Sequence, residues 1–183
     1  MHTGGEVMAL HRLQRRVQPL PLLVLVDVSG SMERYARLLL AFLHAATRQA
    51  HGMRIRRDVF AFGTHLTDLT PAFRLQDADA MLTEASRAID DFAGGTRLGD
   101  SLVLIVSDGL DTGESEELAR ELACLKRHTR RLLWLNPLLR FDGYAPTARG
   151  AAELHRAADG MLAVHNLSAL QTLGHAIAAL IQQ

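Results

Sequence analysis

The stretch Leu22-Leu-Val-Leu-Val-Asp-Val-Ser-Gly-Ser31 decides how the rest of the sequence is interpreted. It opens with a continuous apolar run, which is typical of a short strand buried on both faces of a parallel sheet. Oxygen-bearing side chains follow at once, with Asp27, Ser29 and Ser31 spaced by two. Because open α/β sheets bind ligands beyond the carboxyl ends of their strands, this junction is the first candidate site.

The chain after this stretch alternates between strand and helix patterns. Apolar residues at helical spacing over 35–46 predict a helix whose inward face includes Leu38. Residues 55–62 and 65–73 are predicted to be strands joined at Gly63-Thr64, as an antiparallel hairpin at the sheet edge. Further strands are expected at 103–106, 132–135 and 161–164, and further helices at 81–92, 115–125, 148–158 and from 168 onward. This order predicts an α/β fold with a doubly wound, mainly parallel sheet.

Two later segments carry the same kind of side chain as the opening stretch. Gly94-Gly95-Thr96 follows a predicted helix, and Ser107-Asp108-Gly109 follows the predicted strand at 103–106. Carboxylate and hydroxyl oxygens suit Mg²⁺, Mn²⁺ or Ca²⁺ rather than soft metals. Because hydroxyls are neutral, a Mg²⁺ held in this way keeps much of its charge and an open position, which a carboxylate of another protein can fill.

The ordered set of these motifs resembles the von Willebrand factor A (VWA) domain, over about residues 20–183. Four further segments resemble its bacterial CoxE-like branch: Thr3-Gly-Gly-Glu6, Phe62-Gly-Thr-His-Leu-Thr67, Trp134-Leu-Asn-Pro137 and His165-Asn-Leu167. The resemblance implies a Rossmann-like sheet with one antiparallel edge strand. It also implies a metal-ion-dependent adhesion site (MIDAS) whose residues are Asp27, Ser29, Ser31, Thr96 and Asp108.

The function that the resemblance implies is protein binding and not catalysis. Members of this branch resemble partners of MoxR-type AAA+ ATPases, in pairs that mature metalloenzymes such as the molybdenum-copper carbon monoxide dehydrogenase. We therefore expect a divalent cation, most simply Mg²⁺, to capture an acidic residue of such an ATPase or of its client protein. Residues 1–19 are expected to be a flank left from an upstream region, with the chain a fragment or a short paralogue.

Composition excludes several other classes of protein. The 183 residues carry 20 basic and 20 acidic side chains, so no net charge attracts nucleic acid. A single cysteine excludes a disulfide scaffold. No apolar run approaches the roughly 20 residues of a membrane span, and the N-terminal segment does not have the pattern of a signal peptide. The expected location is the cytoplasm.

Three alternative interpretations of the opening stretch stay open at this point. Ser31 could instead cap the following helix, or the cation site could be degenerate and the domain a scaffold. A hydrolase is the third. Its nucleophile would be Ser29 or Ser31, with His165 and Asp108 completing a triad, or Asp27, as in a phosphatase. The hydrolase lacks the G-x-S-x-G elbow, and a phosphatase would want a second acid where Ser29 stands.

One junction does not fit the family pattern. Residues 99–102 should there open a helix, and the strand at 103–106 should come about 20 residues later, since a parallel crossover needs that length. Either the gene carries a deletion here or the printed sequence omits a loop and a helix. Among the expected cation ligands, Thr96 is the one that this shortening affects.

Overall fold

The computed structural model describes residues 20–48, 56–63, 65–75, 101–110 and 115–181. Within them, six strands form one sheet in the order β3-β2-β1-β4-β5-β6. The strands are β1 (Leu22–Asp27), β2 (Arg57–Phe62), β3 (Leu66–Asp68), β4 (Ser101–Val106), β5 (Thr129–Asn136) and β6 (Gly160–Ala163). Every neighbouring pair is parallel except β2 with β3 at the edge. The predicted Rossmann-like α/β fold with one antiparallel edge strand is confirmed.

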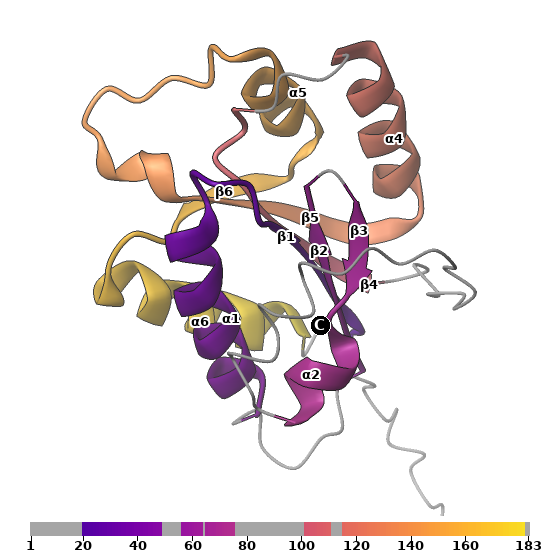
Figure 1. The fold of residues 1–183 in the computed structure, drawn as a ribbon, viewed down its shortest axis with the longest axis vertical. Helices are drawn as coiled ribbons and strands as arrows, with labels where there is room; N and C mark the ends of the chain where they lie inside the picture. Colours follow the sequence, from indigo (N-terminus) through magenta and orange to yellow (C-terminus); the bar gives the residue numbers. More distant parts are fainter. Residues whose placement is uncertain (1–19, 49–55, 64, 76–100, 111–114, 182–183) are drawn as a thin grey trace, which may run out of the picture.

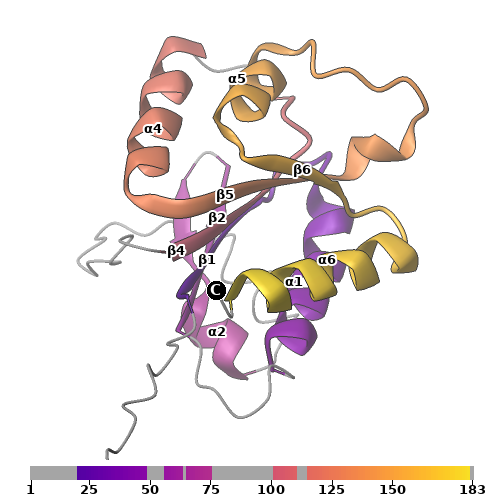
Figure 2. The same ribbon diagram turned by 180° about the vertical axis from the view of Figure 1, so that it is seen from behind.

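Helices cover both faces of this sheet (Figures 1 and 2). They are α1 (Glu33–Arg48), α2 (Thr70–Leu75), α4 (Ser115–Arg127), the 3₁₀ turn η1 (Pro137–Arg140), α5 (Arg149–Ala157) and α6 (Leu167–Ile181). Helices α1, α2 and α6 lie on one face, and α4 and α5 lie on the other. None of the helices in the described part of the chain is long and apolar enough to cross a membrane.

The central strand β1 contributes to two separate hydrophobic cores. Val24 and Val26 pack on the side of α1 and α6, whereas Leu23 packs with Trp134 on the side of α4 and α5. Side chains of a strand alternate between the faces of a sheet, so a strand covered on both faces must be apolar throughout. The continuous apolar run is explained by this double burial.

The inward face of α1 differs from the predicted one. Leu38, expected to point inward, is 50% exposed. The buried residues of this row are Met32, Ala36, Leu39, Leu40 and Leu43. Met32 lies just before the helix and is fully buried, so it fixes the helical phase, and the other four follow at helical spacing.

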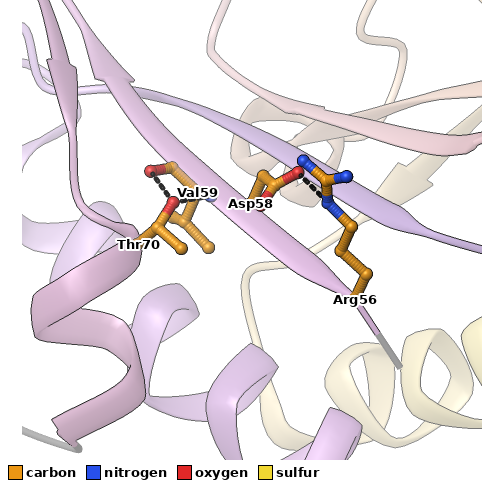
Figure 3. Close-up of polar contacts among 4 residues, drawn as sticks. All are labelled: Arg56, Asp58, Val59 and Thr70. Atoms are coloured by element: carbon orange, nitrogen blue, oxygen red, sulfur yellow. Dashed lines mark hydrogen bonds and ion pairs between the residues drawn. The ribbon is translucent and has the colours of Figure 1, made fainter. Parts of the chain in front are cut away.

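The strand predicted over 65–73 is wrong beyond Asp68. Thr70 leaves the sheet edge because its hydroxyl takes over the pairing with β2: Oγ1 accepts the Val59 N–H at 3.0 Å and contacts the Val59 carbonyl oxygen at 3.4 Å (Figure 3). Asp68 Oδ1 accepts the Thr70 N–H at 2.8 Å. Pro71 then sits in the first turn of α2, where its missing N–H costs no hydrogen bond.

Strand β4 begins at Ser101, before the predicted start at residue 103 and well before the start that the family pattern implies. The family pattern predicted a helix opening over 99–102, but Ser101 and Leu102 belong to the strand and Leu102 pairs with Leu22. The Leu102 N–H donates to the Pro21 carbonyl oxygen at 2.8 Å, and its side chain is fully buried. Only residues 97–100 separate Thr96 from this strand in the sequence. The predicted helix at 81–92, the glycines at 94–95 and Thr96 lie outside the described residues.

Candidate functional site

Asp27, the last residue of β1, is held by hydrogen bonds through both carboxylate oxygens. Oδ1 accepts the Ser29 N–H at 2.8 Å, and Oδ2 accepts the Ser107 hydroxyl at 2.8 Å. The side chain is buried, with the residue 8% exposed. Each oxygen of a carboxylate has a further lone pair, so Asp27 retains acceptor capacity while its orientation is fixed.

The two predicted serines form the exposed part of the site. Ser29 Oγ and Ser31 Oγ lie 3.3 Å apart at the surface. The Ser29 carbonyl oxygen accepts the N–H groups of Met32 and Glu33 and so starts α1. The structure therefore places the Ser31 hydroxyl beside Ser29, whereas the helix-cap interpretation would have placed it on a backbone N–H of α1.

Asp108 follows the neighbouring strand β4 and is also buried, at 4% exposed. Its Oδ1 accepts the Leu110 N–H at 3.0 Å. Gly109 between them has a left-handed φ of +74°, and a Cβ there would lie 2.8 Å from Cα of Ala151 in α5. In Figure 1 the segment after β4 runs up to α5, which agrees with this contact. Glycine is required here because both backbone conformation and space exclude a side chain.

Ser107 lies at the centre of the candidate site but was not among the five predicted cation ligands. Its hydroxyl donates to Asp27 and accepts the Gly109 N–H at 3.0 Å, and its carbonyl oxygen accepts the indole N–H of the fully buried Trp134 at 2.9 Å. Val26 pairs with Val106, so Asp27 and Ser107 continue neighbouring strands side by side. The sequence contained one signal of this role, the position of Ser107 directly before Asp108.

Asp27 and Asp108 are buried carboxylates that a nearby positive charge would stabilise. Within the described residues, the ion pairs of the basic side chains go to Asp58, Glu153 and Asp159, and none goes to Asp27 or Asp108. Burying a carboxylate without a compensating charge is strongly unfavourable. Two carboxylates with nearby serine hydroxyls fit a hard divalent cation by donor chemistry.

The cation would depend on these mixed donors. No cluster of three or more His, Cys, Asp or Glu side chains that could hold a metal occurs among the residues that the structure describes. The structure brings Asp27, Ser29 and Ser31 together and joins them through Ser107 to the strand end that carries Asp108. Thr96, the fifth predicted ligand, lies outside the described residues.

His165 is not arranged as the base of a triad. Its Nε2 lies 2.8 Å from Asn166 Nδ2, and its Nδ1 is buried without a hydrogen-bond partner. Asn166 Oδ1 accepts the Ala169 N–H at 2.8 Å, which orients the amide so that Nδ2 faces the ring. A serine base needs a ring nitrogen within hydrogen-bond reach of the hydroxyl, and here both nitrogens are engaged elsewhere or enclosed.

A mainly parallel open sheet with an oxygen-rich cluster at the carboxyl ends of its two central strands is the architecture of a VWA domain. The chain belongs to the family described as VWA domain containing CoxE-like protein, whose model matches residues 1–170. No curated protein matches the chain in sequence.

Solved structures support the fold. A von Willebrand factor type A protein from Catenulispora acidiphila is similar with a TM-score of 0.59 at 15% identity, over 88% of this chain and 42% of that one. Proximal thread matrix protein 1 from the mussel byssus has a TM-score of 0.52 at 12% identity, over 90% and 46%. An aerotolerance-related membrane protein from Bacteroides fragilis NCTC 9343 has a TM-score of 0.51 at 13% identity, over 88% of this chain and 98% of that one. This chain thus spans less than half of the first two.

Proposed function

We propose that this chain is a metal-dependent protein-binding module with a MIDAS-type site and that it is not an enzyme. The observation that carries the proposal is the pair of buried carboxylates, Asp27 and Asp108, which have no basic partner among the described residues. Ser107 links the two strand ends that bear them. The proposed ligands of the cation, bound directly or through water, are Asp27, Ser29, Ser31, Thr96 and Asp108.

The distribution of burial supports binding of a partner at this site. The carboxylates are buried, whereas Ser29 and Ser31 are exposed at the surface. A cation held between them would face solvent on the serine side. Mg²⁺ bound by few charged ligands retains water and exchangeable positions, so a carboxylate of another protein has both the charge and the access to bind. Mn²⁺ and Ca²⁺ have the same ligand preference and are alternative occupants.

Membership of the CoxE-like family supports a particular class of partner. The proposed partner is a MoxR-type AAA+ ATPase or its client, presenting an acidic residue, in the maturation of a metalloenzyme or the assembly of a complex. The proposed location is the cytoplasm, where such an ATPase has its nucleotide.

One observation favours a second candidate, a scaffold domain whose cation site is degenerate. Only residues 97–100 separate Thr96 from β4, which is shorter than the family pattern. A missing ligand would weaken cation binding without disturbing the fold. Direct measurement of cation binding separates the two candidates.

The test is a Mg²⁺ titration followed by thermal unfolding. A cation that binds only the folded chain must raise the melting temperature as its concentration increases. Asp27→Ala should abolish the rise, and Glu117→Gln, which removes an exposed carboxylate on α4, should retain it. The chain should also retain a MoxR-type ATPase in Mg²⁺ and release it in chelator. A melting temperature that is flat up to millimolar Mg²⁺ would favour the degenerate site.

A further inference from the structure

An arginine is stacked on aromatic rings next to the candidate site. Cζ of Arg140, in η1, lies 4.4 Å from the ring centroid of Phe141 and 5.9 Å from that of Tyr35. Cζ of Arg34 lies 5.7 Å from the same Tyr35 ring. Tyr35 is in the first turn of α1, about one helical turn beyond Ser31. Both ribbon views show η1 beside the start of α1 (Figures 1 and 2).

The stacking leaves the guanidinium edge available for a ligand. Neither Arg140 nor Arg34 forms an ion pair with a carboxylate of the described residues, and both are exposed. The neighbouring acids Glu33 and Asp142 are also exposed. A ring face attracts a guanidinium and restricts its rotamers without occupying its N–H groups. Those N–H groups form a planar fork that matches a carboxylate.

Two exposed apolar side chains lie in the segments that follow β4 and β5 at the same edge of the sheet. Phe141 is 52% exposed at the end of η1, and Leu110 is 53% exposed in the segment after β4. Interfaces between proteins are enriched in aromatic residues and arginine, and their strongest contacts combine the two. The surface beside the candidate site therefore has the composition of a binding surface.

We infer that Arg140, held by Tyr35 and Phe141, is a second anchor for the acidic segment that the proposed function captures. The segment carries two carboxylates: one completes the cation site, and the other pairs with the Arg140 fork. This inference rests on the proposed function, because the first carboxylate needs the cation. The inference adds a specificity to the proposed function: the site would recognise a segment with two acidic residues and not a single acidic residue.

The experiment selects peptides from a random displayed library on the full chain loaded with Mg²⁺, with release by chelator. Selected peptides should carry paired acidic residues. Arg140→Gln should lower the affinity of the best peptide about tenfold or more, since a hydrogen-bonded charge pair is lost. Replacing the second acid of the peptide by glutamine should have the same effect, and the two changes together should add little. Arg130→Gln is the matched control, because Arg130 is exposed at the opposite end of β5.

Two further variants test the geometry. Arg140→Lys keeps the charge but loses the fork, so its affinity should be intermediate. Phe141→Ala removes an exposed ring, so the chain should fold normally and bind severalfold more weakly. If Arg140→Gln binds the peptides like the unchanged chain while Mg²⁺ dependence persists, the second anchor is wrong and the proposed function stands. If nothing is selected in Mg²⁺, both are overturned.

Discussion

Ser107 donates its hydroxyl proton to Asp27 Oδ2 at 2.8 Å, across 80 positions of the sequence. The bond joins the carboxyl ends of β1 and β4, the two strands at the centre of the sheet. Ser107 is itself fixed by the Gly109 N–H and by the indole of Trp134. The orientation of Asp27 is thus set by hydrogen bonds within the protein, so a cation would meet a carboxylate that is already positioned.

Ser107→Ala should weaken both the fold and cation binding. The change leaves a buried Asp27 oxygen without its hydrogen-bond donor, which costs about 1–3 kcal/mol in the free energy of unfolding. Urea unfolding measures this loss, with Ser168→Ala on the exposed first turn of α6 as the control. Mg²⁺ affinity by calorimetry should also fall. Unchanged stability in the Ser107 variant would mean that the link to Asp27 is not formed in solution.

Asp108→Asn should separate charge from hydrogen bonding. Asparagine retains an oxygen that can accept the Leu110 N–H, but it removes the buried negative charge. In chelator the variant should be as stable as the unchanged chain or more stable, because an unpaired buried carboxylate is unfavourable. In Mg²⁺ its melting temperature should not rise. A cation-dependent rise equal to that of the unchanged chain would exclude Asp108 from the site.

Gly109, which follows Asp108, can be tested against Gly143 as a matched control. Both have left-handed backbone, with φ of +74° and +76°. A Cβ at Gly109 would meet Ala151 at 2.8 Å, whereas a Cβ at Gly143 meets nothing within 4 Å.

The pair separates the cost of conformation from the cost of contact. Gly143→Ala should lower stability by about 1–2 kcal/mol, the cost of a left-handed alanine. Gly109→Ala should cost clearly more, because α5 must also move away. Urea unfolding of the two variants measures the difference. Equal losses would show that the segment after Asp108 is not packed against α5.

The residues of the site that were predictable from sequence are those that lie within a few positions of the end of a predicted strand. Asp27 ends one strand, with Ser29 and Ser31 just after it, and Asp108 follows another strand, so a strand pattern was sufficient to place them at one edge. The role of Ser107 depends on the register of β1 against β4, which brings two distant residues together. The alternation of side chains along one strand does not determine its register against the neighbouring strand.

The errors in the predicted secondary structure also come from contacts between residues that are far apart in the sequence. The strand predicted to reach Phe73 ends at Asp68 because the Thr70 hydroxyl bonds the backbone of β2. Leu38 is exposed because the buried Met32 sets the phase of α1. In both cases local pattern favoured one structure and a tertiary contact selected another. Element type was predictable where the pattern was long, and boundaries were not.

The pair Lys126 and Asp159 predicts a pH dependence away from the candidate site. Asp159 accepts the Leu132 N–H at 2.8 Å and forms an ion pair with Lys126 at the end of α4. Burial raises the pKa of Asp159, but the hydrogen bonds from Lys126 and Leu132, with the charges of Lys126 and Arg131, outweigh it. The pKa therefore lies below its usual value.

A carboxyl whose pKa is lower in the folded chain stabilises it above the unfolded pKa and loses this effect as the pH falls through the folded one. Asp159→Asn should therefore destabilise the chain at neutral pH, and the difference should close in acid below about pH 4. Lys126 and Asp159 are both partly exposed, so solvent screening limits the difference to about 1 kcal/mol or less. Urea unfolding across this pH range measures it. A difference that widened as the pH fell would contradict the lowered pKa of Asp159.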